Sequence, residues 1–129
     1  KPAPLLNPET LEPMTLEELS VIFCEELAKQ GISAEVINLR TIKPYDEQII
    51  AESVAKTNRL VIAQEGPKVG GWAAEIGAMV TEKYFEYLAA PVERVTCLDI
   101  PVSFAPSLED YYMLTPEDIV KACKKTVEF

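Results

Sequence analysis

Seven residues from Glu65 to Gly71 form the part of this sequence that most resembles a ligand-binding turn. They read Glu-Gly-Pro-Lys-Val-Gly-Gly and join the end of an apolar run to the start of a helical pattern. Ligands of α/β proteins often bind where strands end, and the N–H groups of a helix start can hold an anion. The spacing is neither G-x-G-x-x-G nor a P-loop, because Trp72 stands where the P-loop lysine belongs. We therefore interpret Gly70 and Gly71 as residues that permit a tight turn and close helix packing.

The sequence offers few other groups for catalysis or metal binding. It contains no histidine, and its three cysteines, Cys24, Cys97 and Cys123, lie far apart without a C-x-x-C pair. A zinc site is therefore not expected, the usual general base is missing, and we interpret the cysteines as reduced thiols. We interpret the adjacent acids Glu109 and Asp110 as solvated loop or interface residues, because successive side chains diverge. No catalytic, cofactor-binding or metal-binding residue is predicted.

The charge pattern restricts the class of partner. A formal net charge of −9 argues against a nucleic-acid ligand and permits a basic protein partner. No apolar run approaches the roughly 20 residues that cross a bilayer, and no targeting segment is visible, so no membrane partner is expected. We expect the arginines to form structural ion pairs with nearby acids. The arginines are Arg40, Arg59 and Arg94, and the candidate acids are Glu65, Asp99 and Glu109.

The elements that must position these residues can be predicted from hydrophobic periodicity. Prolines at four positions make regular structure improbable in residues 1–14, and a single domain is predicted over residues 15–129. A capping box at Thr15 opens a helix that ends at Gly31. Alternating strand and helix patterns then predict a three-layer α/β/α sandwich with a mainly parallel sheet. We expect strands over 33–39, 59–64 and 92–98, and helices over 46–57, over 71–88 and from Thr115 onward.

Five motifs occur in a fixed order between Glu25 and Phe129. They are EVINLRTIKPYD, SVAKTNRLVIAQE, GGWAAEIGAMV, LAAPVERV and DIPVSFAPSLEDYY. Together they resemble the C-terminal, transketolase-type domain of the β subunit of 2-oxoacid dehydrogenase E1 components. That family usually has an apolar strand directly before its first helix, where this chain has NPETLEPMTLEELS. Either the chain is altered there, or Leu5–Leu6 or Leu19–Phe23 supplies a substitute strand.

The resemblance implies a role in a thiamin-diphosphate- and magnesium-dependent enzyme of two α and two β subunits. Such an enzyme decarboxylates a 2-oxoacid, here most simply pyruvate, and acylates the lipoyl group of the E2 acyltransferase. Its catalytic and cofactor-binding groups belong to the α subunit and the N-terminal half of β, so this chain alone is predicted to be non-catalytic and to bind no cofactor. The compartment implied is the mitochondrial matrix or a bacterial cytoplasm. Branched-chain oxoacids and acetoin remain alternative substrates.

The same resemblance implies that this domain serves assembly, through contact with the E1 α subunit, a second β subunit and the basic subunit-binding domain of E2. Motif matching places E2 docking at Glu93 and at the carboxylate of Phe129, while Ala89 replaces a glutamate that some relatives carry. The implied subunit interface comprises Gly70, Gly71, Trp72 and Glu75. Two alternatives stay open: a free-standing non-catalytic protein-binding module, and the equivalent domain of another thiamin enzyme such as a transketolase.

Overall fold

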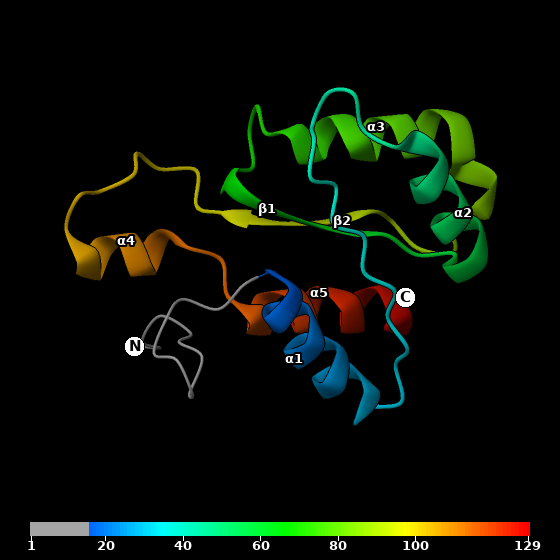
Figure 1. The fold of residues 1–129 in the computed structure, drawn as a ribbon, viewed down its shortest axis with the longest axis horizontal. Coiled ribbons are helices and arrows are strands. Elements are labelled where there is room, and N and C mark those ends of the chain that lie inside the picture. The colour runs from blue at the N-terminus through cyan, green and yellow to red at the C-terminus, as the bar shows by residue number, and fades with distance from the viewer. Residues whose placement is uncertain (1–15) are drawn as a thin grey trace.

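A computed structural model describes residues 16–129 of the chain (Figure 1). Two strands form its sheet, β1 (Val61–Pro67) and β2 (Glu93–Cys97). The helices are α1 (Leu16–Ala28), α2 (Glu47–Thr57), α3 (Trp72–Tyr84), the short 3-10 helix η1 (Phe85–Tyr87), α4 (Pro106–Tyr112) and α5 (Pro116–Glu128).

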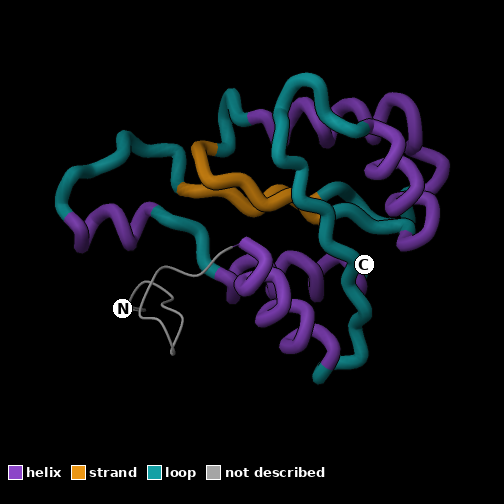
Figure 2. The backbone as a smooth tube through the Cα atoms, in the orientation of Figure 1, coloured by secondary structure: helices purple, strands orange, loops and turns teal. Residues whose placement is uncertain are grey.

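The two strands are parallel and lie between two layers of helices. Val61 pairs with Glu93 and Gln64 with Thr96, and the register shifts between Gln64 and Pro67. Helices α2 and α3 lie on one face of the sheet, while α5 packs against the other face and α1 packs on α5 (Figures 1 and 2). The predicted α/β sandwich with a parallel sheet is therefore confirmed, and the expected order of strand, helix and strand is present in β1–α3–β2.

The main core lies between the sheet and the helices α2 and α3. Ile50 and Val54 of α2 lie in one buried cluster with Ile62 of β1. Helix α3 contributes Ala73, Ile76, Met79 and Val80 to this cluster. Helix α2 is fixed at both ends, because the Asp46 carboxylate accepts a hydrogen bond of 3.1 Å from the Ile49 N–H and Asn58 ends the helix in the left-handed conformation.

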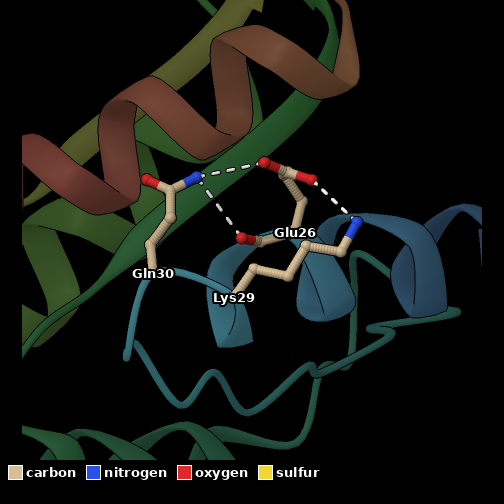
Figure 3. A network of polar contacts seen from close by, with 3 residues as sticks. All are labelled: Glu26, Lys29 and Gln30. Atoms are coloured by element: carbon tan, nitrogen blue, oxygen red, sulfur yellow. Dashed lines mark hydrogen bonds and ion pairs between the residues drawn. The ribbon is translucent and has the colours of Figure 1, made fainter.

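The end of α1 is set by glycine and by local polar contacts. Gly31 has a φ of 76°, and the N–H of Ile32 donates to the Leu27 carbonyl at 3.0 Å, which is the Schellman arrangement. Figure 3 shows how the Glu26 carboxylate binds both the Lys29 ammonium and the Gln30 amide, each at 3.2 Å. The predicted stop at Gly31 is confirmed.

The predicted strand over 33–39 is wrong. That segment has no strand assignment and pairs with neither β1 nor β2. Its side chains still alternate, since Ile37 and Leu39 pack on the core while Val36 and Asn38 are exposed. The physical reason is that a strand exists only with a hydrogen-bonded neighbour, and no described strand lies beside this segment.

Other boundaries also differ from those expected. The predicted helix over 71–88 ends at Tyr84 and continues as η1, and the region expected to be a loop contains α4, with Pro106 at its first turn. Of the two proposed substitutes for the first strand, Leu19–Phe23 is wrong because it lies within α1. The other, Leu5–Leu6, and the proline-rich segment 1–14 lie outside the described residues.

Candidate assembly surface

The turn between β1 and α3 is organised around one buried side chain, that of Gln64. Its carboxamide oxygen accepts a hydrogen bond of 2.7 Å from the Ala73 N–H, and its amide donates to the Pro67 carbonyl at 2.8 Å. Gln64 is only 3% exposed and so occupies the position where an anion would meet the helix start. The Gln64 side chain therefore supplies the hydrogen-bond partner of both the Ala73 N–H and the Pro67 carbonyl, which supports a structural role for the turn.

The glycine pair supports the same structural role. A Cβ at Gly71 would lie 2.1 Å from the Gln64 amide nitrogen and 2.6 Å from the Pro67 carbonyl oxygen, so only glycine fits. Gly70 has a φ of 74°, which L side chains rarely adopt. Next to the pair, Trp72 is half-buried and packs against the main core. Glu75, one turn further, is exposed. The interface assigned to these four residues stays a prediction.

A different face of α3 carries an open apolar groove, which we call the α3 groove. Its floor is built from the small residues Ala74, Gly77 and Ala78 of α3. Phe85 and Phe129, exposed to 68% and 78%, rise at its rim. The volume is about 810 Å³. Small residues let another backbone approach closely, and exposed aromatic rings are typical anchors of protein interfaces. The lining is completed by Thr81, Glu82, Leu88, Ala89, Ala90, Pro91, Val92 and Arg94.

The two docking residues suggested by the sequence lie in different electrostatic settings. The Glu93 carboxylate at the start of β2 forms an ion pair of 2.5 Å with the Lys125 ammonium of α5. Its side chain is 25% exposed. Phe129 comes one helical turn after Lys125 and lines the α3 groove beside Arg94. A basic partner that uses Glu93 must therefore compete with Lys125.

The expected ion pairs of the arginines are wrong for Arg59 and Arg94. The Arg59 guanidinium donates to the Thr126 carbonyl at 2.7 Å, and that of Arg94 donates to the Lys68 carbonyl at 3.2 Å. Each arginine binds a main-chain carbonyl in place of a carboxylate. Thr126 lies in the last turn of α5 and Lys68 directly follows β1, so these carbonyls have no partner within their own element. The hydrogen bond of Arg59 therefore connects the last turn of α5 to the segment directly before β1.

The groups with chemical reactivity do not converge on one site. Cys24, Cys97 and Cys123 are free thiols, as predicted, and burial raises the pKa of Cys123. Tyr112 is buried, and burial is the main cause of its raised pKa. Within residues 16–129, no group of three acidic or cysteine side chains could hold a metal ion. None of the helices in that range combines the length and apolar character needed for a bilayer crossing.

Comparison with known proteins decides the family. The family described as the transketolase C-terminal domain matches residues 15–119. This chain belongs to that family. It is 48% identical over 104 residues to the mitochondrial pyruvate dehydrogenase E1 component subunit beta of Dictyostelium discoideum, covering 81% of this chain and 29% of that protein. The residues matched to the family therefore include the turn, the α3 residues that line the groove and Glu93, whereas Phe129 lies after the match.

Other relatives of this transketolase C-terminal domain widen the comparison. The pyruvate dehydrogenase E1 component subunit beta-1 of Arabidopsis thaliana is 52% identical over 101 residues, covering 78% of this chain and 28% of its own length. The 2-oxoisovalerate dehydrogenase subunit beta of Dictyostelium discoideum is 46% identical over 101 residues, covering 78% and 27%. The chain thus spans less than a third of the length of these relatives.

Proposed function

We propose that this chain is the assembly and docking domain of the E1 β subunit of a thiamin-diphosphate-dependent 2-oxoacid dehydrogenase complex. The observation that carries the proposal is the identity of 48% to 52% with pyruvate dehydrogenase β subunits across about four fifths of the chain. The named oxoisovalerate relative is 46% identical, so pyruvate is the favoured substrate of the whole enzyme. Relatives named as mitochondrial, and one from the bacterium Rickettsia felis, support the matrix or a bacterial cytoplasm.

The chemistry of such an enzyme requires thiamin diphosphate and magnesium, which this domain does not fit. The chain has no histidine, and its described acids do not gather into a metal-binding group. Its one buried carboxamide among the described residues, that of Gln64, is saturated by main-chain partners. We therefore assign the cofactor to other parts of the enzyme and derive no catalytic step from this chain.

The partners proposed for the domain are the E1 α subunit, a second β subunit and the subunit-binding domain of E2. The α3 groove supports a contact with another β subunit, because its small-residue floor and exposed Phe85 favour close helix packing. The net charge of −9 supports attraction of a basic E2 segment, mainly through the rate of association. Glu93 and Phe129 stay the proposed docking residues.

Docking of E2 can be tested through the Glu93–Lys125 pair. If a lysine-rich E2 subunit-binding domain uses Glu93, Glu93→Gln should weaken its binding by about 1–3 kcal/mol, the range for hydrogen bonds to charged groups. Lys125→Gln should strengthen binding, because it releases Glu93 from its internal partner. Isothermal titration at low and high salt measures both effects. Unchanged affinity for the E2 domain in both variants would show that Glu93 is not part of the docking surface. The contact between two β subunits is measured separately, by sedimentation of the chain alone.

A further inference from the structure

Two of the three cysteines lie on helices that pack against each other. Cys24 and Cys123 stand in the second halves of α1 and α5, and α1 makes its main contact with α5 (Figure 1). Both are free thiols, and both side chains are half-buried. The third cysteine, Cys97, is buried in β2. The contact between α1 and α5 is thus the place where two cysteines of this chain can meet.

Helical periodicity places both thiols on the sides of α1 and α5 that meet. Cys24 comes four residues after Ser20 and three before Leu27, so the three side chains share one face of α1. Ser20 and Leu27 line one cavity together with Cys123 of α5, and Leu27 is fully buried. After burial, charge on Cys24 is the second cause of the raised pKa of Cys123, and such an interaction weakens with distance. Cys24 and Cys123 are therefore neighbours across the helix contact.

A contact of this kind brings two backbones close enough for a disulfide. The axes of packed helices lie about 8–10 Å apart and Cα atoms stand about 2.3 Å from each axis, so facing Cα atoms approach to about 4–6 Å. A disulfide needs a Cα separation of about 4.4–6.8 Å. Facing cysteines on α1 and α5 can therefore be joined without separating the helices.

We infer that Cys24 and Cys123 form a reversible intramolecular disulfide that fastens α1 to α5 when the chain meets a small-molecule disulfide as oxidant. One cysteine thiolate attacks a sulfur of the oxidant, which forms a mixed disulfide and releases one thiol. The other cysteine thiolate then attacks the protein sulfur of the mixed disulfide and releases the second thiol. The two cysteines are oxidised, the oxidant is reduced to two thiols, and these thiols take up the two protons that the cysteines lose. This modification site does not depend on the proposed function.

The bridge should act mainly on α1, because α5 is already fixed to the sheet. Arg59, before β1, donates to the Thr126 carbonyl of α5 at 2.7 Å, and Lys125 of α5 pairs with Glu93 of β2. Helix α1 has α5 as its main packing partner. A disulfide between these helices also closes a long loop that contains both strands, which restricts the unfolded chain. Oxidation should therefore slow the opening of α1 and raise the stability of the chain.

The test uses the whole chain, first reduced and then incubated at low protein concentration with oxidised glutathione. Mass spectrometry should find a monomer that is lighter than the reduced chain by two hydrogen atoms. Complete digestion with trypsin places the three cysteines on different peptides, residues 1–29, 95–121 and 122–124. The linked peptides should be 1–29 and 122–124, which contain Cys24 and Cys123.

Matched variants separate this bridge from other oxidation. Cys24→Ser and Cys123→Ser should each abolish the loss of two hydrogen atoms, whereas Cys97→Ser should form the bridge as the parent does. Oxidation should raise the melting midpoint of the parent by at least about 5 °C and slow amide exchange in α1 at least about tenfold. Neither change should occur in Cys24→Ser or Cys123→Ser. If Cys97→Ser does not fold, the tryptic peptides of the parent still distinguish Cys97 from the other two cysteines.

Several results would overturn the inference. One is a linked peptide that contains Cys97. Others are a chain that carries only mixed disulfides with glutathione, a product that consists only of disulfide-linked dimers, or three thiols that all stay reduced. The expected bridge with an unchanged melting midpoint and unchanged exchange in α1 would contradict the fastening of α1 to α5.

Discussion

Gln64 and Ala73 are joined by a hydrogen bond of 2.7 Å that connects the end of β1 to the first turn of α3. The same carboxamide reaches the Pro67 carbonyl, so a single buried side chain caps the helix and closes the turn. Gly71, the N-cap residue, supplies no side chain for this purpose. The position of α3, and with it the α3 groove, therefore depends on Gln64.

Replacing Gln64 by methionine should destabilise the chain by about 1–3 kcal/mol. Methionine has a similar length but leaves the Ala73 N–H and the Pro67 carbonyl without a partner. Urea denaturation measures the change in the free energy of unfolding. Gln48→Met, at an exposed position of α2, is the control and should change this free energy by less than about 0.5 kcal/mol.

Gly71, at the start of α3, and Gly77, within it, should respond to alanine in opposite directions. Gly71→Ala brings a methyl group within 2.1 Å of Gln64 and should cost about 1–3 kcal/mol. Gly77→Ala meets Val92 at an ordinary 3.7 Å inside a helix and should stabilise the monomer by about 0.5–1 kcal/mol. Thermal unfolding of both variants at low protein concentration checks the signs, and equal signs would contradict the packing described.

The Glu47 cluster should make stability depend on acidity. The Glu47 carboxylate accepts hydrogen bonds from the Lys83 ammonium at 2.9 Å and from the Tyr84 hydroxyl at 3.0 Å. These hydrogen bonds lower the pKa of Glu47 below 4.5, and the bond with Lys83 has the larger effect. Because the folded pKa is depressed, the stabilisation is complete above pH 4.5 and is lost as pH falls through the lowered value.

Glu47→Gln checks this pH dependence. Its free energy of unfolding should lie below that of the parent by a constant amount near neutral pH, and the two should converge in acid. Urea titrations across the acid range measure the difference. A gap that persists unchanged to low pH would show that the ionised carboxylate contributes nothing.

The capping box of α5 offers a local test of helix formation. The Thr115 hydroxyl accepts from the Asp118 N–H, and hydrogen bonds from Thr115 are the main cause of the lowered pKa of Asp118. Thr115→Ala should cost about 0.5–2 kcal/mol, while Thr115→Ser should stay close to the parent. Denaturant unfolding distinguishes the two, and equal losses would assign the effect to the methyl group.

Local signals in the sequence were enough for most of the fold. Asp46, Gly31 and Thr115 act through neighbours a few residues away, so the helix ends that they set are confirmed. The segment 33–39 has the alternation of a strand but no partner, and pairing is a property of the whole sheet rather than of the segment. Close helix packing was predicted at Gly70 and Gly71, whereas the ion pair of Glu93 with Lys125 joins positions far apart in the sequence and has no local sequence signal.

The central claim is that this domain assembles through the α3 groove, and sedimentation equilibrium tests it most directly. The parent chain should form dimers, and Ala78→Glu, which places a charge on the groove floor, should weaken the dimer at least about tenfold. Ala55→Glu, on the exposed side of α2, should leave the dimer unchanged. A parent that stays monomeric at every concentration, or an Ala78→Glu variant that dimerises as the parent does, would contradict the account.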